Sequence, residues 1–445
     1  MKPAPEIFEN EYPRVPLAPL LMFCVYVLIW YLQIGARVHF LGAIRIELLW
    51  AIPLTILAVQ QRPQFRSPAA ILIIMYFLAL ITQIPLSQDF PTSWTVFVDR
   101  IIKFSFMALF IISFVKSPRG LVFFIGAFLL ACLKMGQEGL FGVITGGLIW
   151  ENQGVMRLHG STSNYAHPNS FAGMALGTLP FIFYLFPLCP AYLKITFLIF
   201  LGLNANIILY TGSRTGYFGL LGFLIVGFLR SNKKLRLLLI GLPVIILCVS
   251  LTPPDYKERF MSSFTHQEKA GHSSEARIQI LKDAYPVFLK YPFGVGVSAF
   301  PAVRTRMFGR FQDTHNLYYE VATNLGIQGF IVFFAYITTM LVLLHKMERS
   351  FKDQLLAVQE AIDNHPPDTD GRLAVVRREL LLMRAVASAV FMFLIIRLTL
   401  GLFGHDLYEI YWWFAGGLTI ALYNMQDIAY DRTQEVLAPY LESEN

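Results

Sequence analysis

The stretch LLLIGLPVIILCVSL, residues 237–251, decides the fold class because it is apolar on every face. A strand of a membrane barrel would alternate between apolar and polar residues over segments of about ten residues, and this stretch does not alternate. Its length approaches the ~20 residues with which an α-helix crosses a hydrocarbon core. The stretch therefore predicts a membrane-spanning helix, and the same test along the chain predicts an all-α protein.

Apolar runs of this kind recur through the 445-residue chain, in which 56% of residues are hydrophobic and only 15% are charged. That composition is far too apolar for an ordinary soluble globular protein. Twelve candidate spans lie near residues 16–34, 43–60, 69–87, 98–115, 121–140, 170–188, 191–210, 216–229, 237–251, 315–345, 381–403 and 405–424. The sequence thus predicts a polytopic membrane bundle of about twelve transmembrane helices.

Two longer polar segments interrupt the bundle and set the predicted domain boundaries. We predict transmembrane helices 1–9 over residues 1–251, an outer loop over 252–314, helix 10 over 315–345, a cytoplasmic loop over 346–380, and helices 11–12 with a cytoplasmic tail over 381–445. Within the outer loop, SSEARIQILKDAYPVFLKYP reads as an amphipathic helix with one apolar face, formed by Ile278, Leu281, Tyr285 and Phe288. We therefore expect this loop to be folded.

Lysine and arginine residues set the orientation. They are concentrated in loops on the side of the N-terminus, such as the RSNKKLR turn at 230–236 and the segment 346–384, which the positive-inside rule assigns to the cytoplasm. The outer loop is also basic, but long loops cross a membrane largely regardless of charge. The net charge of +7 is therefore an orientation signal. Without interleaved basic and aromatic residues it predicts no nucleic-acid partner.

Two arginines on the predicted outer side are placed unusually. Arg214 lies in the short turn GSRTG between two spans, where a cation must snorkel, pair or face a wet cavity. Arg277 lies in the first turn of the outer-loop helix, where the helix dipole disfavours a cation. Snorkelling of Arg214 to headgroups and pairing of Arg277 with Glu275 are the alternatives to a functional role.

A third polar cluster, RLHGSTSNYAHPNSFAG at 157–173, precedes a span and contains Arg157, His167 and Asn169. Asn169 or Ser170 is expected to cap the following helix. Capping explains Asn169, but it explains neither Arg157 nor His167. The histidines are too loosely spaced for a metal site, and we expect no metal and no cofactor.

The stretch DTHNLYYEVATNLGIQG, residues 313–329, places His315 at the edge of a span. If this stretch is helical from Thr314, then Ala322, Gly326 and Gly329 lie on the face of His315 at 3.6 residues per turn. Such a seam of small residues lets a neighbouring helix pack closely and would hold His315 at the outer surface. A structural histidine paired with Asp313 is the alternative.

Arg157, Arg214, Arg277 and His315 all fall on the predicted outer side. Arginine holds phosphate oxygens bidentately and keeps its charge, while histidine accepts a proton near neutral pH. A cluster of these residue types suits an anionic, membrane-borne substrate.

These motifs resemble the O-antigen ligase and polymerase family of envelope glycosyltransferases. The family signature of His, a small amide or hydroxyl residue, nine residues, Gly, two residues and Gly is similar to the run from His315 and Asn316 to Gly326 and Gly329. GSRTG around Arg214 resembles the arginine turn of the family. EARIQILKDAYPVFLKYPFGVGVSAF resembles its loop helix with an essential arginine and a following Gly-x-Gly turn, and RLHGSTSNYAHPNSFAG its pattern before a middle span.

The resemblance implies a metal-independent glycosyltransferase in the bacterial inner membrane, with its active site facing the periplasm. Its donor would be a glycan on undecaprenyl diphosphate and its acceptor the lipid A-core. Arg214 and Arg277 would hold the diphosphate and stabilise its departing charge, and His315 would be the general base on the acceptor hydroxyl. The supporting substrate contacts would be Arg157, Asn316, His167 and Asn169.

Other functions fit parts of the same pattern. An O-antigen or exopolysaccharide polymerase and a protein O-oligosaccharyltransferase share the donor and differ in the acceptor. A transporter of anionic lipids would need polar residues at mid-membrane depth, where the spans offer few besides Arg397 and Lys103. A noncatalytic scaffold would leave the cations and His315 far apart.

Overall fold

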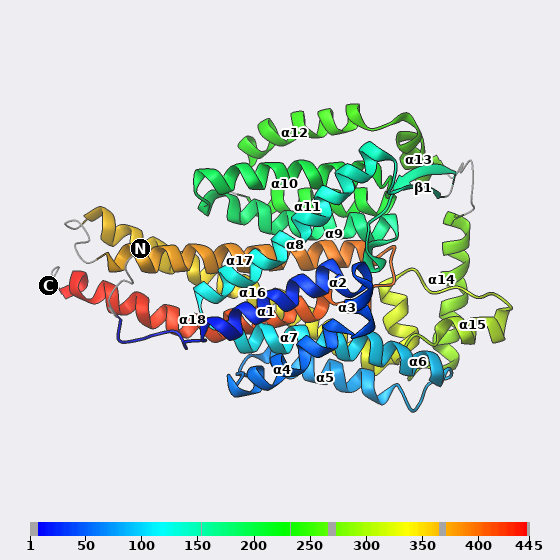
Figure 1. Cartoon of the computed structure of the whole chain (residues 1–445), viewed down its shortest axis with the longest axis horizontal. Helices are drawn as coiled ribbons and strands as arrows, with labels where there is room; N and C mark the ends of the chain where they lie inside the picture. Colours follow the sequence, from blue (N-terminus) through cyan, green and yellow to red (C-terminus); the bar gives the residue numbers. More distant parts are fainter. Residues whose placement is uncertain (1–7, 153, 232, 266–272, 365–370, 443–445) are drawn as a thin grey trace.

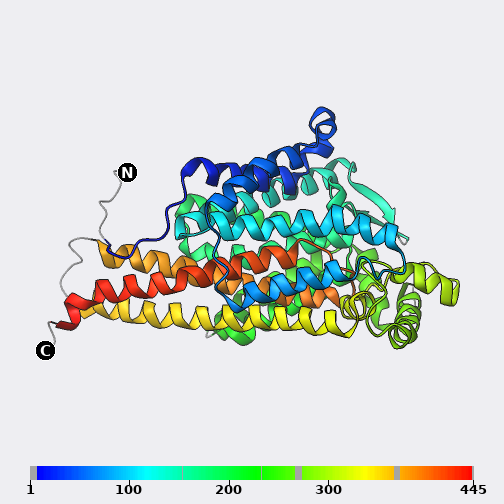
Figure 2. The same ribbon diagram turned by 90° about the horizontal axis from the view of Figure 1, so that it is seen from below.

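The computed structural model describes residues 8–152, 154–231, 233–265, 273–364 and 371–442. Long helices run side by side along one axis, and short helices, loops and a small hairpin gather at one end (Figure 1). At the other end, α16 (Leu317–Asn364), α17 (Arg372–Gly401) and α18 (Tyr411–Glu442) extend beyond the other helices (Figure 2). This helical architecture agrees with the predicted all-α fold class.

The first part of the chain supplies α1 (Leu17–Leu32), α2 (Ile34–Arg37), α3 (His39–Ala43), α4 (Ile46–Gln60), α5 (Pro68–Thr82), α6 (Phe90–Val96), a π-helical turn (Phe97–Ile102), α7 (Lys103–Phe114) and α8 (Pro118–Thr145). The strands β1 (Ile149–Asn152) and β2 (Val155–Leu158) then form an antiparallel hairpin, with Ile149 opposite Leu158. The hairpin is absent from the sequence prediction, because four-residue strands carry too few alternations to stand out.

The middle of the chain supplies α9 (Pro168–Leu185), α10 (Ala191–Tyr210), α11 (Arg214–Arg230), α12 (Lys234–Leu251), α13 (Pro254–Thr265), α14 (Ser273–Lys290) and α15 (Phe300–Phe308). Single 3-10 turns occupy Ser163–Tyr165 and Phe186–Leu188. Helices α13, α14 and α15 all belong to the segment that the sequence predicts as a folded outer loop.

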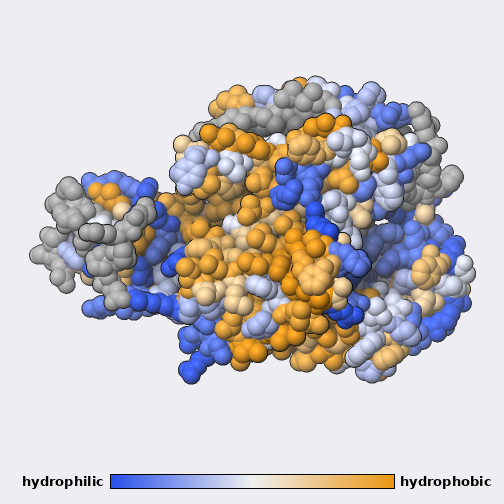
Figure 3. Space-filling view, viewed as in Figure 1, coloured by the Kyte–Doolittle hydropathy of each residue, from blue (hydrophilic) through white to orange (hydrophobic). Residues whose placement is uncertain are grey.

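Among the described residues, five helices are long and apolar enough to cross a membrane by length and composition: α8, α9 with its following turn, α10, α16 and α17. The helices α1, α4 and α5 are apolar but shorter. On the face drawn in Figure 3, apolar residues cover most of the middle of the bundle and polar residues gather at its ends. The chain is therefore of the multi-pass membrane type, and the count of twelve crossings stays a prediction.

Gly326 breaks the helical backbone of α16, with φ 68° and ψ −171°. There the chain pairs with the loop that follows α14. The N–H of Val295 donates to the carbonyl of Thr323 at 2.9 Å, and the N–H of Ile327 donates to the carbonyl of Pro292 at 2.9 Å. The predicted helical seam is therefore wrong at Gly326, because this glycine accommodates the backbone of a loop and not the face of a helix.

This break gives a first testable expectation, the loss of stability in Gly326→Ala. An added Cβ would lie 2.2 Å from the carbonyl carbon of Phe293, in a backbone region that is nearly restricted to glycine. We expect the free energy of unfolding to fall by about 2–5 kcal/mol, measured by denaturant titration of the purified protein. Gly309 has the same φ of 68° and open space around its Cα, so Gly309→Ala should cost about 1 kcal/mol. Equal losses in the two variants would contradict this account.

The segment from α13 to α15 has a small core of its own, formed by Ile280, Ala284, Val287, Val295, Ala299, Phe300 and Val303. The predicted apolar face of α14 is wrong, since Ile278 and Tyr285 are 49% and 59% exposed. The buried face also contains Asp283, which accepts a hydrogen bond from the buried Arg304 of α15 at 2.9 Å. A search for apolar residues could not find the true buried face, because that face includes the charged Asp283. The ion pair between Asp283 and Arg304 fixes α14 against α15.

Candidate active site

His315 lies in a turn before α16 and not inside a helix that begins at Thr314. Its backbone is left-handed, with φ 47°, which few residues other than glycine adopt. The side-chain oxygen of Asn316 accepts the N–H groups of Tyr318 at 3.0 Å and Tyr319 at 3.1 Å, the bonding pattern of a helix N-cap. The orientation of His315 is therefore set by a strained turn and by the capped start of α16. The predicted helical face that His315 would share with Ala322, Gly326 and Gly329 is wrong.

The ring of His315 is partly buried among charged neighbours. It makes a T-shaped contact with the ring of His405, with centroids 5.1 Å apart. The pKa of His315 is lowered to about 4, first by burial and then by its neighbours His405 and Arg277. Asp313 opposes this shift of the pKa, and His167 adds slightly to it. An imidazole with so low a pKa is neutral at pH 7 and is able to accept a proton.

The charges that act on His315 come from separate elements of the fold. Arg277 belongs to α14, and His167 begins α9, yet both are near enough to His315 to shift its pKa. These elements meet at the end of the bundle where Figure 1 places α14 and the hairpin. The structure therefore brings His315, Arg277 and His167 together.

Arg157 projects from β2 and is 1% exposed. Its guanidinium donates to the carbonyl of Thr211 at 2.7 Å, to the side-chain oxygen of Asn152 at 2.8 Å and to that of Asn169 at 2.9 Å. The hydroxyl of Ser213 donates to the same oxygen of Asn169 at 2.8 Å. Arg157 therefore joins the hairpin, the start of α9 and the turn between α10 and α11, and its planar group is occupied by protein acceptors.

This network holds the residue before Arg214. The hydroxyl of Ser213 caps α11 by accepting the N–H of Gly216 at 3.1 Å while it donates to Asn169. Arg214 is the first residue of α11, so its backbone is fixed next to the start of α9. Arg157 is thus linked through Asn169 and Ser213 to the start of α11, while a contact of Arg157 or Asn169 with substrate stays a prediction.

His167 is the N-cap of α9, with Pro168 in the first turn. Its Nδ1 accepts the N–H of Asn169 at 3.2 Å. The prediction that Asn169 or Ser170 caps this helix is therefore wrong. Helix α9 begins at Pro168, which places His167 at the N-cap and Asn169 inside the first turn.

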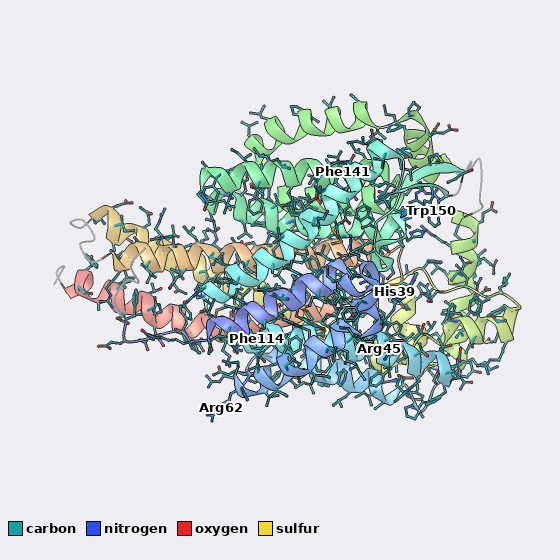
Figure 4. All side chains as sticks on the ribbon, in the orientation of Figure 1. His39, Arg45, Arg62, Phe114, Phe141 and Trp150 are labelled. Carbon is teal, nitrogen blue, oxygen red and sulfur yellow. The ribbon has the colours of Figure 1, made fainter. Side chains whose placement is uncertain are left out.

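The network gives a second testable expectation, the cost of Arg157→Lys. Lysine keeps the charge but lacks the planar group that reaches three acceptors at once. We expect a loss of about 2–4 kcal/mol in the free energy of unfolding, from buried acceptors that lose their donors. The exposed Arg62, which Figure 4 shows projecting from the bundle, is the matched control, and Arg62→Lys should change stability by less than about 0.5 kcal/mol. Denaturant titration of both variants measures the difference, and two equal values would refute the structural role of Arg157.

Sequence reasoning missed residues 402–410, which it placed partly inside a span over 405–424. Helix α18 begins at Tyr411, so these residues form a loop, and the loop carries His405 next to His315. The polar run GHDLYE inside an otherwise apolar region was the available signal. In the described part of the chain, no group of three or more His, Cys, Asp and Glu side chains is arranged to hold a metal ion.

The fold and the site together define a multi-pass helical membrane protein with a histidine and arginine cluster at one end of its bundle. Residues 197–334 match the family model described as O-Antigen ligase, and this match contains Arg214, Arg277 and His315. The resemblance in the motifs is thereby confirmed, and the matched part of the chain is a domain of the O-antigen ligase family, whose members are glycosyltransferase-like enzymes. No curated protein matches the chain.

Proposed function

We propose that this protein transfers a glycan from undecaprenyl diphosphate to the lipid A-core, at the periplasmic face of the bacterial inner membrane. The observation that supports this proposal best is the electrostatic influence of Arg277 on His315, whose pKa it lowers. His315 offers a neutral imidazole and Arg277 a permanent cation. The two residues come from separate elements within the matched residues. A base beside an anion-binding group is what transfer from a diphosphate to a hydroxyl requires.

In the proposed reaction, Arg277 and Arg214 bind the diphosphate oxygens of the donor. The acceptor hydroxyl oxygen forms a bond to the anomeric carbon of the glycan while the bond from that carbon to the phosphate oxygen breaks. His315 takes the proton of the hydroxyl. The arginines stabilise the negative charge that appears on the departing undecaprenyl diphosphate, so the chain's own side chains supply both the base and the charge stabilisation.

The position of the cluster suits a donor whose diphosphate lies at the membrane surface. Trp94 and Trp150 are exposed large aromatic residues of α6 and β1, and both elements lie at the end of the bundle where α14 is found (Figure 1). Tryptophan is enriched where a membrane meets water. A headgroup at this level would reach the arginines while its polyprenyl chain stayed among lipids.

Glycan polymerisation is the second candidate, because it uses the same donor and also ends on a hydroxyl. Deletion of the gene, followed by analysis of lipid-linked and lipid A-linked glycans, separates the candidates. Accumulation of polymer that is not joined to lipid A would support the ligase, and single repeat units on lipid A would identify a polymerase. Unchanged glycans, or lipid translocation by proteoliposomes without an acceptor, would reject a transferase.

A further inference from the structure

The loop 402–410 is anchored by side chains from distant parts of the chain. Glu320 of α16 is 1% exposed, and its side-chain Oε2 accepts the N–H of Leu407 at 3.1 Å. The hydroxyl of Tyr76 donates to the carbonyl of the same Leu407 at 2.8 Å. A buried polar group is costly unless it is hydrogen-bonded, so this contact fixes the loop on α16.

Two more hydrogen bonds hold the loop on either side of His405. The indole N–H of Trp412 donates to the carbonyl of Asp406 at 2.7 Å, and the side-chain amide of Asn316 donates to the carbonyl of Leu402 at 3.0 Å. Asn316 directly follows His315 and also caps α16. The backbone that carries His405 and the backbone that carries His315 are therefore tied to each other.

The two imidazoles meet in a defined arrangement. Their planes are inclined by 73° and their centroids lie 5.1 Å apart, the edge-to-face geometry that ring pairs prefer. His405 is exposed, whereas His315 is half-buried. An exposed ring therefore lies against the side of the partly buried ring, and both are held by segments with their own anchors.

We propose that His405 is a positioning residue of the transfer reaction, whose ring orients the ring of His315. This inference rests on the proposed function, in which His315 is the base. His405 gives no contact to the transferred group in this account. It acts through the ring of His315.

Several groups around His315 shift its pKa. The pKa of His315 is lowered by burial first, then by His405 of the loop and Arg277 of α14, with a small addition from His167 of α9. Asp313, in the turn before His315, raises the pKa. Replacement of His405 by an uncharged residue should therefore raise the pKa of His315.

The test measures the titration of His315 directly, without turnover. Neutral imidazole reacts with diethyl pyrocarbonate and protonated imidazole does not, so mass spectrometry of the His315 peptide against pH gives its midpoint. His405→Phe keeps an aromatic ring against His315 and removes the charge. We expect its midpoint to rise by about half a pH unit or more. His39→Phe changes an exposed histidine on α3 at the same end (Figure 4) and should leave the midpoint unchanged.

A second variant separates ring packing from charge. His405→Ala removes both, and we expect transfer at neutral pH to fall by about tenfold or more because the orientation of His315 is lost, while His405→Phe stays near the wild-type rate. A midpoint in His405→Phe equal to that of the wild type, or full transfer by His405→Ala, would overturn the role of His405. Absence of transfer by the wild-type protein itself would reject the proposed function instead, so the two failures are distinguishable.

Discussion

Replacement of His315 by asparagine is expected to reduce glycan transfer by about 10²–10⁴-fold, because the acceptor hydroxyl then loses its base. Asparagine is the sharpest choice for this position. It tolerates the left-handed backbone with φ 47°, so the turn before α16 is preserved. Its amide cannot take up a proton at neutral pH. The rate of transfer by purified protein in proteoliposomes, with a lipid-linked donor and a lipid A-core acceptor, measures the loss.

The control for this variant is another histidine at the same end of the bundle. The ring of His159 lies 5.5 Å from that of Trp150 and its Nδ1 is 3.0 Å from the carbonyl of Gly160. His159→Asn should transfer at a rate close to that of the wild type. If His315→Asn kept wild-type activity, or if both variants lost it equally, His315 would not be the base.

The same assignment fixes the pH dependence. The base is active when neutral, and burial, together with the neighbours His405 and Arg277, lowers the pKa of His315 from 6.5 to about 4. Transfer by the wild type should therefore be complete above about pH 5 and half lost near pH 4, as protons titrate the imidazole. An acid limb near pH 6.5 would contradict the burial of this ring.

Part of this site could be read from the sequence because residue type alone carries the signal. Arginines at the ends of apolar runs and the His315 segment stand out in any hydropathy scan. The predictions that were wrong concern residues whose partners lie far away in the chain. The true buried face of α14 contains Asp283, which its pairing with Arg304 and Arg310 makes compatible with burial.

The prediction for residues 402–410 was wrong for the same physical reason. Its amide at Leu407 is satisfied by Glu320, 87 positions away in the sequence, and no local pattern announces such a bond. Likewise, Arg157 has the residue type of a phosphate ligand, but its donors are occupied by acceptors from β1, the start of α9 and the end of α10. The sequence indicates which side chains are chemically able to bind or react with a substrate. Long-range hydrogen bonds show which of these side chains have a structural role instead.

Arg277→Ala is expected to lower the rate of transfer by about 10²–10³-fold, the usual cost of removing a group that stabilises charge on a leaving oxygen. Arg277→Lys should recover part of that loss, because lysine supplies the charge without the bidentate geometry. If Arg277 acts on the departing diphosphate, kcat falls with kcat/KM. If it only holds the bound donor, KM rises at unchanged kcat. Rates across a range of donor concentrations separate these cases.

The acid limb of the activity gives a second, independent measure of where Arg277 lies. Its charge lowers the pKa of His315, so the limb should move to higher pH in Arg277→Ala and stay near the wild-type position in Arg277→Lys. Arg306 of α15 is an exposed arginine of the same segment, and Arg306→Ala should alter neither rate nor limb. A loss of rate without a shift of the limb would place Arg277 on the donor but away from the base. A shift without a loss would make it a neighbour of His315 that does not touch the diphosphate.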